Sequence, residues 1–375
     1  MPVSIHNGNE KNENIILQQK KNHIIVIYAM LLTLGLCGCL AIYSATFNSN
    51  HPKFFVVKQF LWLFFGVLLL WVSSLIKFKY YQKIIMPLII VCYFLLILVL
   101  FKGHAVNGMN GWFEFPVKIF SFKFYFQPSE VAKAVFILFS SQYLLNSKND
   151  WKNFWHYSLI AAIWLLPIVL QPDFGTVLVY AVALALFFFN EVKNWKYILL
   201  WSIPLIVALI WIFMDPSYVT ERFIGFLYPE SDPFNSGWHI NQFRYTIARG
   251  GLAGSNWGNA IWANYYLPLA HSDSAYASIS EACGFVGMLI VCLSLASLSY
   301  CGFFLSEKTQ NLVARRYILG ATIIFSCQAL IHMGVNLTLL PTTGITLPIL
   351  SYGGSSMIAT MLLFGIMISA AKSDV

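Results

Sequence analysis

The strongest constraint on this chain is a series of apolar runs, each about as long as a helix that crosses a lipid bilayer. An α-helix rises about 1.5 Å per residue, so about 20 apolar residues reach across the hydrocarbon core. The runs are His23–Thr46, Phe54–Leu75, Ile84–Phe101, Gln127–Leu145, Trp155–Leu170, Phe174–Phe189, Tyr197–Met214, Ala275–Leu305, Tyr317–Leu339 and Gly344–Ala371. We therefore expect an all-α polytopic membrane protein of about ten transmembrane helices.

The composition leaves no room for a separate soluble domain. Hydrophobic residues make up 58% of the 375 residues and charged residues only 10%, whereas soluble domains carry about a quarter charged residues. Residues 1–22 are polar, and we expect a disordered tail there, ahead of a single transmembrane domain over residues 23–375. The seven cysteines all fall in apolar runs, which favours packing over disulfides or a metal cluster.

The distribution of charge predicts the orientation of the bundle. Ten spans place both termini on one side, and the positive-inside rule makes the lysine-rich side cytoplasmic. The basic residues on the side of the termini are Lys11, Lys20, Lys21, Lys77, Lys79, Lys83, Lys148, Lys152, Lys193, Lys196, Lys308, Arg315, Arg316 and Lys372. The carboxylates on the other side are Glu114, Asp173, Asp215, Glu221, Glu230, Asp232 and Asp273. We expect the chemistry on the outer face, and we attribute the net charge of +8 to topology and anionic lipid rather than to nucleic acid.

Two outer loops are long enough to carry function. The first, Lys102–Phe126, contains Trp112, and the second, Asp215–Ser274, joins the seventh and eighth spans. Loops of this length are usually functional or disordered, and the second loop is too aromatic for disorder. Within it, Gly237–Ala248 predicts a short amphipathic helix, and Arg249–Asn259, here called the glycine loop, predicts a tight turn.

A polar loop passes into the eighth apolar run within Tyr266–Gly287. Asp273 lies at that boundary, and Glu281 follows eight residues later. Ionisable side chains at such depths are expensive, so both are functional candidates. The alternative for Asp273 is that it caps the helix together with Ser272.

Three further ionisable residues lie at the outer ends of spans. Glu130 and Lys133 are three residues apart on one face of the fourth span. Lys133 is a candidate for binding an anionic headgroup with Glu130 orienting it, and the alternative is a self-neutralising pair. Asp173 starts the sixth span and is a substrate-binding candidate, with a plain N-cap as its alternative.

Trp112 of the first outer loop, Arg249, His271 and Ser355 complete the candidates for substrate binding. Exposed backbone amides and a guanidinium can form an anion nest, which favours Arg249 beside its paired glycines. His271 is a candidate base or ligand, but its spacing from Asp273 is not that of a metal site. Ser355 belongs to SYGGSS, Ser351–Ser356, for which close helix packing is the alternative.

These motifs resemble the SEDS family, the FtsW and RodA glycan polymerases of bacterial cell-wall synthesis, over nearly the whole chain after the tail. The matching stretches are NGMNGW, FQPSEVAK, QPDFGT, RFIGFLYPESDP to GWHINQ, RGGLAG, YLPLAHSD, SEACGFVG, MGVNLTLLPTTGITLP and SYGGSS. RGG and GNA in the large loop, Asn336 in MGVN, and LPTTGITLP resemble the cell-division branch, FtsW, more closely.

The resemblance implies a ten-helix glycosyltransferase of the bacterial cytoplasmic membrane that polymerises lipid II into a growing glycan strand on the outer face. It implies that Asp273 matches the family's essential Asp, and that Glu130, Lys133 and Asp173 match its polar residues. It also implies a class B penicillin-binding transpeptidase as partner, together with other division or elongation proteins.

The chain departs from the family pattern at two places. The family motif usually reads LPEAHTD, and Leu269 replaces its Glu. Asn110 and Gly111 stand before Trp112, where members usually carry a basic pair. These changes bear on activity and on how pyrophosphate is bound.

The mechanism expected from these residues is an inverting glycosyl transfer, metal-independent or weakly assisted by a divalent cation. Asp273 takes the proton from the 4-hydroxyl of an acceptor GlcNAc, and that oxygen attacks the anomeric carbon of the lipid-linked donor. Lys133 and Arg249 are the candidates for neutralising the pyrophosphate that leaves. Two other hypotheses stay open, a flippase or transporter of lipid-linked precursors and a non-catalytic scaffold that activates a transpeptidase.

Overall fold

Helices make up most of the computed structural model, which describes residues 3–49, 52–106, 109–117, 122–144, 151–192, 196–197, 199–201 and 218–374. The helices are α1 (Val3–Ala45), α2 (Pro52–Leu75), α3 (Phe78–Lys83), α4 (Ile85–Lys102), α5 (Pro128–Tyr143), α6 (Trp151–Leu170), α7 (Phe174–Val192), α9 (Tyr218–Leu227), α10 (Trp238–Gly250), α11 (Ile261–Tyr265), α12 (Ala275–Lys308), α13 (Leu312–Asn336) and α14 (Gly354–Ala371). The strands are β1 (His104–Val106), β2 (Met109–Val117) and β3 (Phe122–Phe126).

Eight of the described helices are long and apolar enough to cross a membrane, namely α1, α2, α4, α6, α7, α12, α13 and α14. The expected fourth span corresponds to α5, which has only 16 residues. The expected seventh span, Tyr197–Met214, lies almost entirely outside the described residues. The all-α polytopic fold, with about ten helices, is confirmed.

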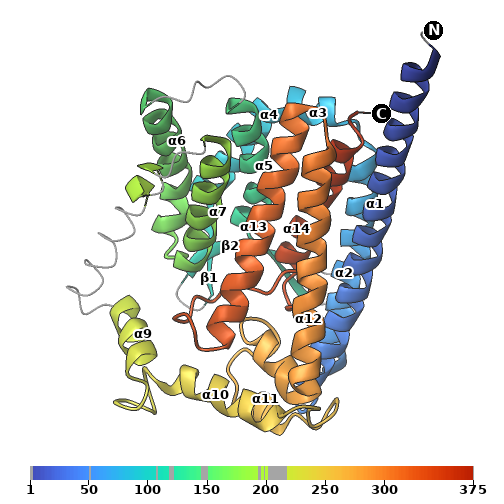
Figure 1. Cartoon of the computed structure of the whole chain (residues 1–375). Coiled ribbons are helices and arrows are strands. Elements are labelled where there is room, and N and C mark those ends of the chain that lie inside the picture. The colour runs from blue at the N-terminus through green and yellow to red at the C-terminus, as the bar shows by residue number, and fades with distance from the viewer. Residues whose placement is uncertain are drawn as a thin grey trace.

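Helices α13 and α14 occupy the centre of the bundle. In each of them 83% of the spanning stretch is buried, whereas in α2 and α4 the buried share is 22%. Figure 1 shows α5, α6 and α7 on one side of this pair and α1, α2 and α12 on the other. The outer helices therefore present apolar side chains to lipid, and the two central helices carry the protein core.

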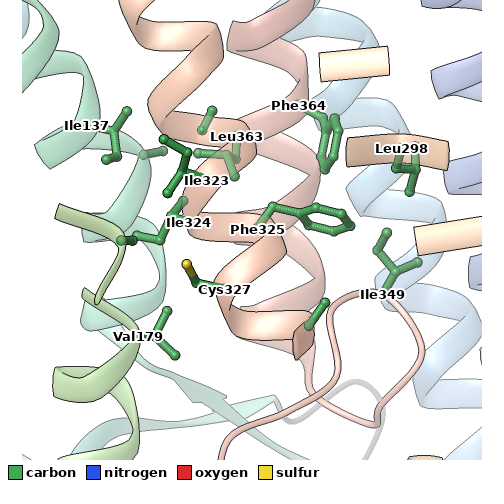
Figure 2. Packing of buried hydrophobic residues seen from close by; sticks show 14 of the residues in the cluster. Ile137, Val179, Leu298, Ile323, Ile324, Phe325, Cys327, Ile349, Leu363 and Phe364 are labelled. Atoms are coloured by element: carbon green, nitrogen blue, oxygen red, sulfur yellow. The ribbon is translucent and has the colours of Figure 1, made fainter. Parts of the chain in front are cut away.

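The core around α13 is built from interlocking aliphatic and aromatic side chains (Figure 2). Phe325 of α13 and Phe364 of α14 meet edge to face, with ring centroids 5.0 Å apart. Ile137 of α5 and Leu298 of α12 approach the same helix from either side and are buried. This packing fixes α5, α12 and α14 around α13, and these helices carry Glu130, Lys133 and Ser355 among the candidate residues.

Both termini lie at one end of the bundle, and the helices α9, α10 and α11 of the large loop lie at the other (Figure 1). The expected separation of the termini from the outer loop is thus met. The structure does not show the disordered tail that the sequence predicts at residues 1–22, because α1 already begins at Val3. Helix propagation from the spanning part into Glu, Lys and Gln residues, which are good helix formers, accounts for the difference.

The first outer loop folds into a three-stranded antiparallel sheet of order β1-β2-β3, which we did not expect from the sequence. The strands β2 and β3 pair from Phe113 opposite Phe126 to Val117 opposite Phe122. Alternating aromatic residues in this stretch were the available signal for strands. In the large loop, the amphipathic helix expected at Gly237–Ala248 is confirmed as α10.

Candidate active site

Asp273 lies in a tight turn, residues 268–274, that leads directly into α12. The backbone amides of Ser272 and Ser274 both donate to the carbonyl of Leu269, at 2.9 and 3.2 Å. Leu269 adopts φ +48°, a left-handed conformation that is unusual for a residue with a side chain. The N-cap position of α12 belongs to Ser274, whose side chain makes no capping hydrogen bond. The alternative in which Asp273 caps the helix stays a prediction.

Helix α13 fixes the backbone of this turn through Asn336, which is fully buried. The Asn336 Nδ2 donates to the carbonyl of Asp273 at 3.0 Å, and its Oδ1 accepts from the amide of Ala277 at 3.0 Å. One side chain therefore holds both the residue before α12 and the first turn of that helix. Because both the nitrogen and the oxygen of the Asn336 side-chain amide are used, the position of the Asp273 backbone depends directly on α13.

The segment between α13 and α14 holds the same turn from a second side. The Ser351 hydroxyl donates to the carbonyl of Ser272 at 2.7 Å, and the amide of Tyr352 donates to the carbonyl of His271 at 2.8 Å. The rings of Phe55 and Tyr352 lie 5.1 and 5.4 Å from the imidazole of His271. Burial lowers the pKa of His271, so its imidazole is neutral near pH 7.

Gly344 leaves room beside the carboxylate of Asp273. It adopts φ +71°, and a Cβ at this position would lie 3.8 Å from the Asp273 Oδ2. Gly175, at the start of α7, packs against the carbonyl of Thr343 in the same segment. The PTTG and QPDFGT motifs thus meet next to the Asp273 turn, where glycine is required for close approach.

Glu130 and Lys133 form a buried ion pair inside the bundle, with 2.8 Å between Oε1 and Nζ. Their side chains are 7% and 8% exposed, so the pairing alternative is met. Lys133 also donates to Gln328 Oε1 at 2.6 Å, and Gln328 Nε2 donates to the carbonyl of Thr346 at 3.1 Å. This chain of contacts joins α5 to α13 and to the segment that holds the Asp273 turn.

The expected outer cavity at Lys133 is closed in this structure. The space beside the ion pair amounts to about 10 Å³, which is about the room for one water molecule. An anionic headgroup therefore reaches Lys133 only after Gln328 or the helix ends move. Its role in substrate binding stays a prediction.

Asp173 joins the start of α7 to Gln127, the residue before α5. Its Oδ1 accepts from the amide of Thr176 at 3.1 Å, so the N-cap alternative is met, and its Oδ2 accepts from Gln127 Nε2 at 2.9 Å. Burial raises the pKa of Asp173, although the bonds from Thr176 lower it. Ser355 is buried as well, and it accepts from the amide of Gln127 at 3.0 Å and donates to the carbonyl of Tyr125 at 2.9 Å.

Trp112 lies on β2 opposite His104 of β1 and is half-buried. The preceding Gly111 is buried beside Gln171, where a Cβ would lie 3.3 Å from Oε1. This Oε1 is buried and has no hydrogen-bond partner among the described residues. The departure from the family pattern at Gly111 thus lies beside an unsatisfied acceptor, which a basic side chain would otherwise reach.

Glu281 is a structural anchor for the large outer loop. Its carboxylate is fully buried and accepts from the amides of Trp262 and Ala263, at 3.0 and 2.6 Å. Arg249 Nε donates to the same carboxylate at 3.1 Å, and its guanidinium lies 5.7 Å from the ring of Trp262. The Arg249 side chain is still 48% exposed, so it can contact a ligand from this fixed position.

Helix α12 is broken at Gly284, whose φ of 66° and ψ of −166° belong to a region that only glycine adopts readily. The glycine loop fills the break. The amides of Ser255 and Asn256 donate to carbonyls of α12 before the break, and the amides of Phe285 and Val286 after it donate to carbonyls of the loop. These bonds, of 2.8 to 3.2 Å, replace those that the helix loses.

The prediction of an anion nest beside Arg249 is therefore wrong in one respect. The loop amides of Gly254, Ser255 and Asn256 donate hydrogen bonds to the carbonyls of Gly250, Glu281 and Ala282, so they are not open to a ligand. The glycines serve close packing against the break in α12, because a Cβ on Gly254 would collide with its backbone.

Comparison with known proteins assigns the chain to a family. The FtsW/RodA/SpoVE model, described as "Cell cycle protein", matches residues 22–374. The chain belongs to this family. It is 32% identical over 362 residues to the "Probable peptidoglycan glycosyltransferase FtsW" of Thioalkalivibrio sulfidiphilus, covering 92% of this chain and 88% of the relative. It is 31% identical over 350 residues to the protein of the same name from Legionella pneumophila, covering 90% and 87%.

Solved members of the FtsW/RodA/SpoVE family share the fold. A chain from a peptidoglycan synthase complex that coordinates polymerization and crosslinking matches with a TM-score of 0.76 and 24% identity, over 93% of this chain and 96% of that one. The rod shape determining protein RodA of Thermus thermophilus matches with a TM-score of 0.65 and 25% identity, over 93% and 95%.

Sequence reasoning missed the polar face of α13 in this FtsW/RodA/SpoVE fold. Gln328, His332 and Asn336 follow one another at intervals of four, which places them on one face of the helix. The structure uses each of them toward the site, with His332 Nδ1 2.9 Å from the carbonyl of Ile345. Polar residues repeated at this interval inside an apolar run were the signal available.

Proposed function

We propose that this chain polymerises lipid II into glycan strands by inverting glycosyl transfer, on the outer face of the bacterial cytoplasmic membrane and for cell division. Relatives named peptidoglycan glycosyltransferase FtsW support the reaction. The lysines near both termini support a cytoplasmic location for that end.

One observation carries the proposal. The turn that contains Asp273 is held by side chains and amides from α13 and from the segment before α14, while its own carboxylate faces the space left by Gly344. Preorganised placement of a base is what proton transfer at a substrate hydroxyl requires.

In the proposed step, Asp273 accepts the proton of the acceptor 4-hydroxyl while that oxygen forms a bond to the anomeric carbon of the donor. The bond from this carbon to the donor phosphate breaks, and its electron pair leaves with the polyprenyl pyrophosphate. The configuration at the anomeric carbon inverts, as expected for one displacement with one base. Asp273 then returns its proton to water.

Arg249 is the first candidate for the charge on the leaving pyrophosphate, because it is half-exposed and anchored by Glu281. Lys133 follows as a second candidate once the closed space beside it opens. As predicted from the sequence, the proposed step is metal-independent or weakly assisted by a divalent cation. Among the described residues no three His, Cys, Asp or Glu side chains gather as metal ligands.

A class B penicillin-binding transpeptidase is the partner that we propose, together with other division proteins. A similar fold lies in a complex that coordinates polymerization and crosslinking, which supports this choice.

Polymer formation from purified lipid II tests the proposal. We expect strands from the wild-type chain with its partner and none above background from Asp273→Ala. Glu230→Ala, which removes an exposed carboxylate of the same outer loop, should retain polymerisation. Translocation of lipid II across liposomes without polymer would support the flippase hypothesis instead.

A further inference from the structure

A second cavity lies at the other end of the molecule. Both termini emerge at this end (Figure 1). Its volume is about 710 Å³, within the range of sites that bind small molecules. Its lining residues belong to α1, α2, α3, the start of α13 and the end of α14, and none of these lining residues takes part in the site at Asp273. We call it the lysine cavity.

The lysine cavity is strongly cationic. Its basic lining residues are Lys20, Lys21, Lys77, Lys79 and Lys372, and no carboxylate of the described residues lines it. Lys20 is neutralised by Asp374 at 2.7 Å. Among the described residues, Lys21, Lys77 and Lys372 have no carboxylate partner. Charges gathered in this way without counterions favour an anionic occupant.

The walls of the lysine cavity are apolar and continue onto the outside of the bundle. Ile25 of α1 is 64% exposed, and Leu75 and Ile76 at the end of α2 are 59% and 40% exposed. All three belong to the face that the protein presents to lipid. A ligand with a charged head and long apolar chains can therefore contact the lysines and these side chains together.

Ser373 adds a polar group that lacks a partner. Its hydroxyl is buried and makes no hydrogen bond among the described residues, and the residue lines the lysine cavity. A buried hydroxyl without a partner is costly, and a phosphate oxygen would satisfy it. Burial also lowers the pKa of Lys372, a shift that a bound anion would oppose.

We propose that the lysine cavity binds the phosphate headgroup of an anionic phospholipid, with the acyl chains lying along the exposed faces of α1 and α2. The site is independent of the polymerase site and of its proposed reaction.

Binding of phosphatidylglycerol to the full-length protein in neutral detergent, counted by native mass spectrometry, tests this proposal. Replacing Lys21, Lys77 and Lys372 together by Gln should weaken binding at least about tenfold, since each charge near a phosphate contributes several-fold. Phosphatidylcholine binding should not change.

The matched control replaces Lys83, Lys152 and Lys308 by Gln, which removes the same charge from the same end of the bundle but outside the cavity. This variant should bind phosphatidylglycerol within about twofold of wild type. Equal losses in both triple variants would mean that lipid binds by diffuse charge, and would overturn the site.

A variant that is expected to tighten lipid binding separates the proposal from misfolding, which would only weaken binding. Asp374→Asn removes the carboxylate that neutralises Lys20, so it should tighten phosphatidylglycerol binding by about fivefold. Unchanged or weaker binding in a variant with wild-type thermal stability would contradict the proposal. Inorganic phosphate should compete poorly, and competition equal to that of the lipid would identify a soluble anion as the ligand instead.

Discussion

At the scale of single residues, burial distinguishes the carboxylates that hold the bundle together from Asp273, the proposed base. Glu130 is buried and paired with Lys133. Glu281 is buried and bound by Arg249 and by the backbone amides of Trp262 and Ala263. Asp273 is only half-buried and lies in a turn whose backbone is fixed by other groups. Of these three carboxylates, Asp273 alone is open enough to meet a substrate, and it is the one that the family resemblance singles out.

The buried pair of Glu130 and Lys133 should be strongly coupled. Glu130→Gln leaves a buried ammonium without its counterion and should lower the free energy of unfolding by about 3 kcal/mol. The double variant Glu130→Gln with Lys133→Met removes the stranded charge and should recover most of that loss. Denaturation in detergent measures both, and a double variant less stable than Glu130→Gln alone would argue against this pairing.

His271 should make the stability of the Asp273 turn depend on pH. Burial lowers its pKa below the ordinary 6.5, so the unfolded chain binds a proton that the folded chain refuses. This contribution is complete above about pH 6.5 and is lost as the pH falls below that value. Between pH 7.5 and 5.5 the Tm of the wild type should therefore fall further than that of His271→Phe. Parallel pH profiles would show that His271 takes no part.

At the scale of elements, the main feature is that the glycine loop is docked into the break of α12. This contact joins the large outer loop to the helix that begins beside Asp273. The loop therefore has a fixed geometry at its α12 end, even though the sequence predicts only a tight turn there.

Gly284→Ala should disrupt this contact. The new Cβ would meet the loop backbone at Leu252 and Gly254, and the conformation itself is strained for alanine, so we expect at least about 2 kcal/mol of destabilisation. Gly251→Ala is the control, since Gly251 also has a positive φ of 52° but nothing lies within 4 Å of its Cβ position. Equal effects of the two substitutions, compared by thermal denaturation, would remove the steric explanation.

The sequence predicts the spans well because a helix in lipid must satisfy all its own backbone groups and be apolar throughout. It also predicts α10, whose amphipathic pattern is local. The break at Gly284 escapes prediction because the glycine loop that fills it lies about thirty residues earlier in the chain. The same holds for Glu281, whose depth in the helix suggests function while its partners come from the outer loop. The three-stranded sheet is local, and the apolar and aromatic residues around it masked the strand signal in β2 and β3.

At the scale of the whole molecule, one end carries the lysine cavity and both termini, and the other carries the Asp273 turn and the large loop. The proposed phospholipid site and the proposed polymerase site are therefore separated by the length of the bundle. The arrangement suits an enzyme that contacts anionic lipid on one face of a membrane and elongates a polymer on the other.

Labelling of single cysteines in intact cells should confirm this polarity. In a variant without native cysteines, a membrane-impermeant maleimide should label Ser231→Cys in the outer loop and not Lys79→Cys beside the lysine cavity. Both positions should react after the membrane is permeabilised. The opposite pattern in intact cells would reverse the proposed orientation.

The central claim is that Asp273 acts as the base, and a comparison of lipid II binding with turnover tests it most directly. Asp273→Asn should bind lipid II within about threefold of wild type, because the side chain keeps its size and the turn keeps its backbone bonds. Its polymerisation rate under single-turnover conditions should fall by at least about 100-fold, the usual contribution of a general base. A polymerisation rate near that of the wild type would contradict the account.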